Sequence, residues 1–94
     1  MTDQTYAVCY RYVPEMETRR DPHRADHLAF LRSQADQGNV LVAGALTDPV
    51  DTAWIVVRSE SEAAAYAMVS HDPYVKAGLV RSITVRPIAL VVPD

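Results

Sequence analysis

The residues of this sequence best suited to chemistry are an ionisable pair, His27 and Asp72, which lie in two separate predicted helical segments. His27 lies early in the first segment, and Asp72 lies at the end of the second, directly before Pro73. A carboxylate beside a histidine fixes the imidazole tautomer and prepares the ring for proton transfer. The pair therefore predicts a site, although whether the two helices bring it together is a geometric question.

Both members of the pair also have ordinary structural explanations. On a helical wheel, His27 lies between Phe30 and Leu31, at the border of the apolar stripe, where a hydrogen-bonded histidine often completes the margin of a core. An aspartate before a proline at the end of a helix is common turn chemistry. Position alone therefore leaves the structural and the functional interpretations open.

Three other residues are candidates for binding a substrate. Arg24 precedes His27 by three residues and leans toward the buried side of the helix. It could hold a substrate anion, although a lone arginine more often extends into solvent. Tyr12 and Tyr74 could donate hydroxyl hydrogen bonds to a ligand, or they could be core aromatics.

Metal and covalent chemistry have weaker support in the sequence. His23 and His27 are four residues apart, so both could bind one cation with His71 or Asp72. This spacing is common by chance, and the glutamate of a metalloprotease helix is absent. Cys9 lies in a predicted strand with no histidine beside it, and there is no glycine-rich phosphate loop. We therefore expect neither a metal nor a cofactor.

Periodicity and turn residues predict main elements in the order β-α-β-β-α-β. Strands are expected at residues 5–13, 40–46, 54–57 and 82–92, helices at residues 21–37 and about 60–70, and a loop at residues 15–20. This order predicts a ferredoxin-like α+β fold, in which a four-stranded antiparallel sheet carries both helices on one face.

Local signals mark the ends of the two helices. Asp21, followed by a proline, is expected to cap the start of the first helix, and Gly38 is expected to end it in a left-handed conformation. Ser59 and Glu62 form a capping-box pattern at the start of the second helix. Pro87 within the last strand indicates an edge position or a bulge.

Two predicted surfaces follow from the spacing of apolar residues. One face of the first helix should carry Leu28, Leu31 and Ala35. One face of the first strand should carry Tyr6, Val8, Tyr10 and Tyr12, an aromatic surface suited either to a dimer interface or to a planar ligand.

The later strands are too apolar for a sheet with one exposed face. Residues 40–43, 54–57 and 88–92 are apolar at successive positions rather than at alternating ones. Such strands normally have both faces covered, and two helices cover only one. We therefore expect a homodimer that packs sheet against sheet, of the dimeric α+β-barrel type.

The composition limits the classes of protein to which this chain can belong. Ninety-four residues with 49% hydrophobic side chains are expected to form one globular domain over residues 1–94. The net charge is -3 and the basic residues are scattered, which argues against a nucleic-acid partner. A single cysteine, the lack of a visible secretory signal and the short apolar runs predict a soluble, cytoplasmic protein without a membrane span.

Taken together, these segments resemble the YCII-related family over nearly the whole chain, from Tyr6 to Val92. The matching residues are Arg24-x-x-His27-Leu28, Gly38, Val40-Leu41-Val42-Ala43-Gly44, Asp72-Pro73-Tyr74-x-x-Ala77-Gly78-Leu79 and Val85-x-Pro87. Each fragment is weak alone, but their order and spacing together are specific.

The resemblance implies a dimeric α+β barrel with a histidine–aspartate pair in a cleft, here His27 and Asp72. One type of related protein is similar to a dehydrochlorinase of a chlorinated hydroxyhydroquinone, and the wider fold group includes muconolactone isomerase. Both are cofactor-free proton transfers on small rings. We therefore expect a lyase or isomerase that acts on a small, aromatic or lactone metabolite; the alternative is a non-catalytic module that binds a small molecule.

Overall fold

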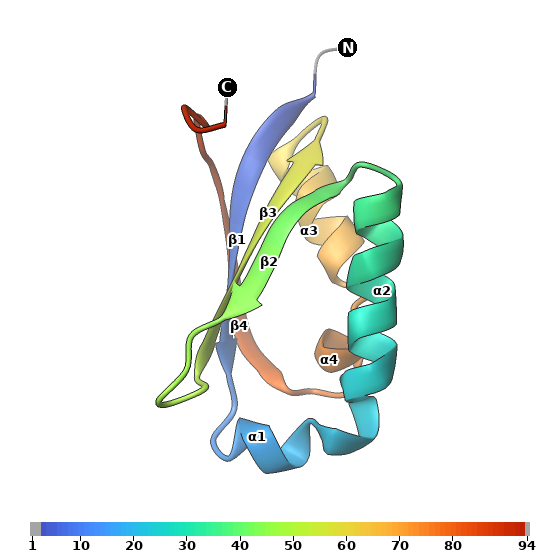
Figure 1. The fold of residues 1–94 in the computed structure, drawn as a ribbon, viewed down its shortest axis with the longest axis vertical. Coiled ribbons are helices and arrows are strands. Elements are labelled where there is room, and N and C mark those ends of the chain that lie inside the picture. Colours follow the sequence, from blue (N-terminus) through green and yellow to red (C-terminus); the bar gives the residue numbers. More distant parts are fainter. Residues whose placement is uncertain (1–2, 94) are drawn as a thin grey trace.

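The computed structural model describes residues 3–93, and its sheet is that of a ferredoxin-like α+β fold (Figure 1). The elements are β1 (Gln4–Tyr12), α1 (Met16–Arg19), the 3-10 helix η1 (Asp21–His23), α2 (Arg24–Asp36), β2 (Val40–Ala45), β3 (Thr52–Ser59), α3 (Glu62–Val69), α4 (Pro73–Lys76) and β4 (Val80–Pro87). The strands are antiparallel in the order β2-β3-β1-β4, and the helices cover one face of the sheet. The predicted fold class is confirmed.

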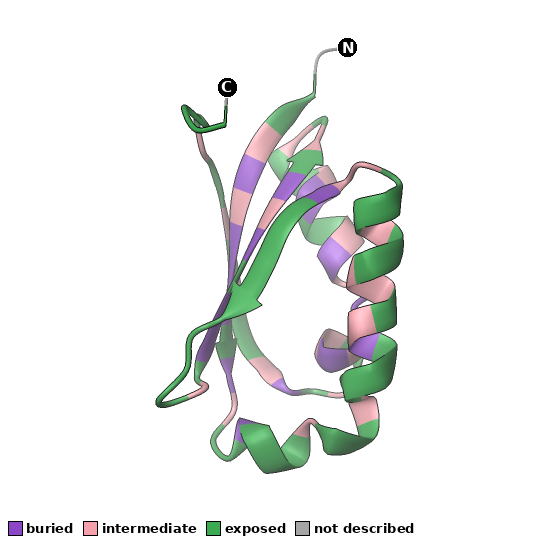
Figure 2. Ribbon diagram, viewed as in Figure 1, coloured by how far each residue is buried: buried purple, intermediate pink, exposed green. Residues whose placement is uncertain are grey.

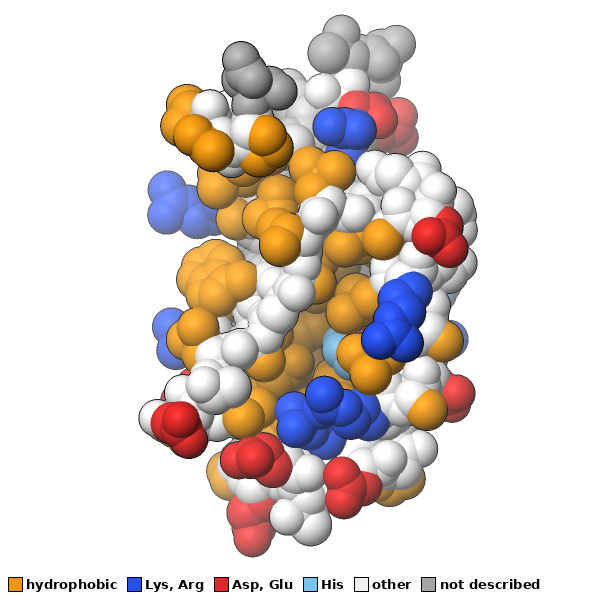
Figure 3. Space-filling view, viewed as in Figure 1, with side chains coloured by type: hydrophobic (Ala, Val, Ile, Leu, Met, Phe, Trp, Pro, Cys, Tyr) orange, Lys and Arg blue, Asp and Glu red, His pale blue; other side chains and the backbone are white. Residues whose placement is uncertain are grey.

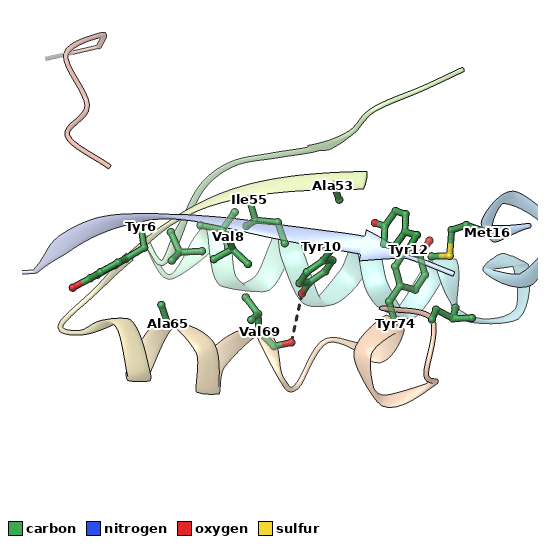
Figure 4. Close-up of a cluster of buried hydrophobic side chains, with 13 residues drawn as sticks. Tyr6, Val8, Tyr10, Tyr12, Met16, Ala53, Ile55, Ala65, Val69 and Tyr74 are labelled. Carbon is green, nitrogen blue, oxygen red and sulfur yellow. Dashed lines mark hydrogen bonds between the residues drawn. The ribbon is translucent and has the colours of Figure 1, made fainter. Parts of the chain in front are cut away.

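The core lies between β1 and the helices and extends from Tyr6 to Met16 of α1 and Tyr74 of α4 (Figure 4). The predicted aromatic face of β1 exists: Tyr6, Val8, Tyr10 and Tyr12 are all buried. It points toward Ala65 and Val69 of α3, so these side chains form the core. The expectation that this face is suited to a dimer interface is therefore wrong.

Helix α2 packs less tightly against the sheet than α3 does. His27 is the one buried residue of this helix, whereas Leu28 and Leu31 are half-buried (Figure 2). Ala35 is exposed, so the predicted apolar face of this helix does not extend to its last turn. The apolar side of α2 borders a cavity, described below, instead of filling the space above the sheet.

Several predicted boundaries differ from the structure. Residues 15–20 are not a simple loop, because α1 forms there and buries Met16 against the core. Asp21 does not cap α2: it lies in the first turn of η1, and His23 is the residue that precedes α2. The expected strand at residues 82–92 ends at Pro87, and the apolar residues after it form an irregular tail.

The helix ends show which local signals operate. The α2 helix ends as predicted: Gly38 has φ +82°, its N–H donates to the Ala35 carbonyl, and the Asn39 N–H donates to that of Gln34. This pair of bonds is a Schellman motif, which favours glycine. At α3, the cap is Ser61, whose hydroxyl accepts from the Ala64 N–H at 3.0 Å, and not Ser59.

The outer face of the sheet is apolar on one half only. Register places Val42 opposite Val56 and Gly44 opposite Trp54 on this face, and the Trp54 side chain is 48% exposed. On β4 the outward residues are polar (Ser82, Thr84 and Arg86), and this strand forms the sheet edge that Pro87 indicated. The apolar outer surface is thus centred on β2 and β3.

Candidate active site

Asp72 is held at the start of α4 by its local sequence. Pro73 opens that helix, and Asp72 before it has an extended backbone (φ −60°, ψ 128°). Its Oδ1 accepts a 2.9 Å hydrogen bond from the Tyr74 N–H, which makes the carboxyl group the N-cap of the helix. The turn explanation of Asp72 is therefore correct, but it accounts for only one of the bonds that this buried side chain makes.

The same carboxyl group also binds the imidazole of His27 from α2. His27 Nδ1 lies 2.8 Å from Asp72 Oδ1, and His27 is 7% exposed. Because a carboxylate accepts, we assign the proton of the neutral ring to Nδ1, which leaves the lone pair on Nε2. Within residues 3–93, Nε2 makes no hydrogen bond, yet it is not among the atoms sealed from solvent.

Tyr10 of β1 supports the pair from the core side. Its hydroxyl donates to Asp72 Oδ2 at 2.9 Å and lies 3.5 Å from the Val69 carbonyl oxygen, the contact drawn in Figure 4. Burial, together with the nearby Asp72 carboxylate, raises the pKa of the Tyr10 hydroxyl well above its usual value. Tyr10 thus remains a donor at neutral pH and keeps Asp72 in place.

An aromatic stack restrains the imidazole ring. The rings of His27 and Tyr74 are parallel within 5° and their centroids are 3.7 Å apart. Tyr12 meets Tyr74 edge-on, with centroids 6.0 Å apart and an interplanar angle of 82°. Burial raises the pKa of both the Tyr12 and the Tyr74 hydroxyls, against an opposing effect of the nearby arginines. Both phenols are therefore neutral donors at physiological pH.

A cavity of about 170 Å³ lies between α2 and the sheet, and His27 forms part of its wall. Figure 3 shows the hollow, lined by hydrophobic side chains, with a histidine visible inside it. The apolar lining residues are Leu28, Leu31, Ala53 and Ile55. The small residues Ala43, Gly44 and Ala45 of β2 form the facing wall, and their size leaves this space open.

Two arginines border the same cavity. Arg24 is one of them, and Tyr12 and Tyr74 also line the space, so the three predicted substrate-binding residues lie around one hollow with His27. The second arginine, Arg20 at the end of α1, was not predicted from the sequence. Its only sequence signal is the doublet Arg19-Arg20, and its position depends on α1, which forms where a loop is expected from the sequence.

The remaining candidates lie elsewhere. His23 and His71 do not line the cavity, and Cys9 is buried in β1 with its thiol free. Over the described residues, no group of three or more histidine, cysteine, aspartate or glutamate side chains is placed to hold a metal ion. The structure therefore does not bring His23, His27 and His71 together as ligands of one metal ion.

The fold and the site define a class: a ferredoxin-like α+β protein with a buried histidine–aspartate pair beside a small cavity. A family model described as the YCII-related domain matches residues 5–89, so the chain belongs to this family. A comparison with functionally curated proteins gave no match. Among residues 3–93, no helix is both long enough and apolar enough to cross a membrane.

Similar solved structures share the fold at low sequence identity. One is the 5-chloro-2-hydroxyhydroquinone dehydrochlorinase of Burkholderia phenoliruptrix in complex with 2,5-dihydroxybenzoquinone, with a TM-score of 0.77 and 20% identity over 90% of this chain and 93% of that one. Another is a NIPSNAP family protein of Agrobacterium tumefaciens, with a TM-score of 0.60 and 14% identity over 98% of this chain and 96% of that one. At these identities the likeness shows the fold.

Proposed function

We propose that this chain is a cofactor-independent enzyme that moves a proton on a small metabolite in a lyase or isomerase reaction. The observation that carries the proposal is the His27–Asp72 pair, bonded through Nδ1 on its buried side and open at Nε2 beside a cavity. A histidine held in this tautomer is suited to act as a general base near neutral pH.

The pair divides the work of proton transfer between its members. His27 Nε2 takes a proton from the substrate, and the ring becomes an imidazolium. The Asp72 carboxylate stabilises that charge through Nδ1–H, while the Tyr10 hydroxyl and the Tyr74 N–H hold the carboxylate in position. The imidazolium then returns the proton to another atom of the substrate or to a leaving group.

The substrate is a small molecule held by Arg24, Tyr12 and Tyr74. A cavity of about 170 Å³ is below the roughly 300–1,000 Å³ that is usual for drug-sized ligands. The similar dehydrochlorinase was solved with 2,5-dihydroxybenzoquinone, a single ring, which supports a ring-sized substrate here. The phenols of Tyr12 and Tyr74 donate hydrogen bonds, and the apolar lining holds the body of the ring.

Two measurements test this proposal. A thermal-shift screen with small aromatic acids, lactones and catechols identifies ligands, because a ligand that binds the native state raises its midpoint. Turnover of the ligands found is then compared for the wild type, His27→Asn and the control His23→Asn. The asparagine amide keeps a donor toward Asp72 but has no basic Nε2.

The expected result is a loss of turnover by roughly 10²-fold or more in His27→Asn, with the fold and ligand binding retained, and full turnover in His23→Asn. If His27→Asn mainly lowers stability and the wild type turns over none of its ligands, the chain is instead a binding module and the proposed reaction is wrong.

We also propose that the chain works as a homodimer joined through the outer sheet face. Val42 and Trp54 expose 60% and 48% of their surface there, and Val56 is the register partner of Val42 and lies two residues from Trp54 on the same strand. Exposed apolar residues that adjoin one another on a sheet usually mark an interface. A cytoplasmic location remains a prediction from the sequence.

A further inference from the structure

Two guanidinium groups from different elements converge on the cavity. Arg20 lies at the end of α1 and Arg24 at the start of α2, and both line the hollow that His27 borders. In Figure 3, Lys and Arg side chains gather along the edge of that hollow. Both arginines also act on the Tyr12 and Tyr74 hydroxyls, lowering their pKa values against the effect of burial.

Within residues 3–93, neither of these two groups is paired with a carboxylate. No aspartate or glutamate lines the cavity, and among the residues that the structure describes no arginine forms an ion pair with a carboxylate. Asp72 is already bound by three donors, and among residues 3–93 neither Asp72 nor Asp21 forms an ion pair with either arginine.

The side chain of Arg20 gives a second sign of a missing partner. Its Nε is shielded from solvent and has no hydrogen-bond partner in the described part of the chain. A shielded donor without an acceptor destabilises the free protein, and native structures seldom retain one without a reason. An acceptor brought by a ligand would bind such a guanidinium group after a small rotation of the side chain.

We propose that Arg20 and Arg24 form an anion-binding site at the cavity and that the molecule on which His27 acts is a small organic carboxylate. The inference rests on the proposed function only in calling that molecule the substrate; the anion site itself rests on the two arginines. Guanidinium groups bind carboxylates through paired, charge-assisted hydrogen bonds.

This arrangement also fits the chemistry assigned to His27. The carboxylate end sits at the arginines, and the apolar body lies between Leu28 and Ile55, beside the imidazole. Fixing one end in this way places the reacting proton within reach of Nε2. The same positive charges stabilise the negative charge that develops on the substrate when the proton leaves.

The test is isothermal titration at low salt with three carboxylate–amide pairs: benzoate, salicylate and 2,5-dihydroxybenzoate, each with its neutral amide. Wild type is compared with Arg20→Gln, Arg24→Gln and Arg19→Gln. Arg19 makes a matched control because it is the exposed neighbour of Arg20 and does not line the cavity. Far-UV circular dichroism and the melting temperature monitor the fold of each variant and of Arg20→Met.

We expect at least one acid to bind at least roughly tenfold more tightly than its amide. Arg20→Gln and Arg24→Gln should each lose about tenfold in affinity for that acid, whereas Arg19→Gln should keep it. The melting temperature of ligand-free Arg20→Met should equal or exceed that of the wild type, because methionine places no N–H donor at the shielded position of the Arg20 Nε. A lower melting temperature would indicate a structural role for this side chain.

Three results overturn the proposal: no acid of the panel binds, an amide binds as tightly as its acid, or the arginine variants bind like Arg19→Gln. Its failure is distinct from failure of the proposed function. If acids bind through the arginines but His27→Asn does not slow turnover, the proposed anion-binding site is supported and the proposed role of His27 as the base is wrong. If turnover requires His27 but amides bind as tightly as acids, the role of His27 as the base is supported and the proposed anion-binding site is wrong.

Discussion

At the scale of single residues, Asp72 is the side chain on which the site depends. Its two carboxyl oxygens accept from Tyr10 of β1, His27 of α2 and the backbone of Tyr74 in α4. The residue is thus a helix cap and a tertiary contact at once. The structural and the functional interpretations of Asp72 do not compete, because the local cap fixes the carboxyl group that holds the histidine.

Replacing Asp72 with asparagine tests this central position. The amide presents a donor where three donors already converge, so at least one buried hydrogen bond to a charged acceptor is lost. We expect the free energy of unfolding to fall by about 1.5–3 kcal/mol, measured by urea denaturation. The exposed Asp36→Asn serves as control, with an expected change within about 0.5 kcal/mol; equal effects of the two substitutions would contradict the bonding described.

The buried tyrosines predict a loss of stability in alkali. Burial raises the pKa of Tyr10 and Tyr12 in the folded state above the ordinary value of 10.0. Their contribution is therefore fully present below pH 10 and is lost as the pH rises further, since only the unfolded chain then releases the protons. Each residue should contribute a slope of about 1.4 kcal/mol per pH unit.

This slope is measured by urea denaturation between about pH 8 and pH 11, the range that brackets the ordinary tyrosine pKa. Tyr10→Phe removes one of the buried hydroxyl groups whose pKa is raised, so its stability should fall less steeply above pH 10 than that of the wild type. It should also be less stable at neutral pH, because the bond to Asp72 is gone. Parallel pH curves for the two proteins would contradict the assignment of a buried, neutral Tyr10.

At the scale of elements, the candidate site depends on a cavity that remains between α2 and the sheet. Its apolar side chains face a cavity, and the opposite wall is made of the small residues Ala43, Gly44 and Ala45. Helix α3, by contrast, packs Ala65 and Val69 directly onto β1. One helix thus completes the core while the other forms the wall of the site.

The cap of α3 gives a prediction with a close internal control. The Ser61 hydroxyl accepts from the Ala64 N–H, whereas the sequence pattern indicated Ser59. Ser61→Ala should therefore destabilise the protein by about 1 kcal/mol, and Ser59→Ala should have a smaller effect. Thermal denaturation of the two variants measures the difference, and the reverse order would contradict the cap described.

The order of the elements was predictable because it depends on strong local patterns. The β-branched and aromatic run of β1 and the glycine that ends α2 both have a local physical cause. The start of α2 was not predicted well, since Asp21 lies in a 3-10 turn that the Asp-Pro signal does not distinguish from an α-helix. The tail after Pro87 is as apolar as a strand, and only pairing partners decide whether such a segment becomes one.

The candidate site was predictable in part for a related reason. His27 and Asp72 stood out by residue type and by the family pattern, but the 2.8 Å bond between them depends on how α2 and α4 pack. Arg20 was missed because it enters the site through α1, a four-residue helix with no clear sequence signal. Long-range packing, which a local sequence pattern does not encode, determines both the His27–Asp72 contact and the position of Arg20.

At the scale of the whole molecule, the outer sheet face predicts self-association. The apolar pattern that suggested a second layer is real on β2 and β3, while the outward residues of β4 are polar. The contact should therefore be centred on Trp54. We expect Trp54→Glu to shift the protein from dimer to monomer at micromolar concentration in sedimentation velocity, because it places a charge in the middle of the interface.

Tyr66→Glu is the control for that experiment, since Tyr66 on α3 is equally exposed but lies away from the outer sheet face. It should sediment like the wild type. A wild type that is already a monomer, or a Trp54→Glu variant that remains dimeric, would contradict an interface at this face.

The most direct test of the central claim, that His27 and Asp72 transfer protons at the cavity, is solvent-deuterium exchange followed by proton NMR. Ligands found by thermal shift are incubated in D₂O with wild type, His27→Asn, Asp72→Asn or His23→Asn. We expect the wild type and His23→Asn to catalyse exchange of a ligand C–H, and the other two variants to do so at least roughly 10²-fold more slowly. Exchange by His27→Asn at the wild-type rate, or no catalysed exchange by the wild type with any bound ligand, would contradict this claim.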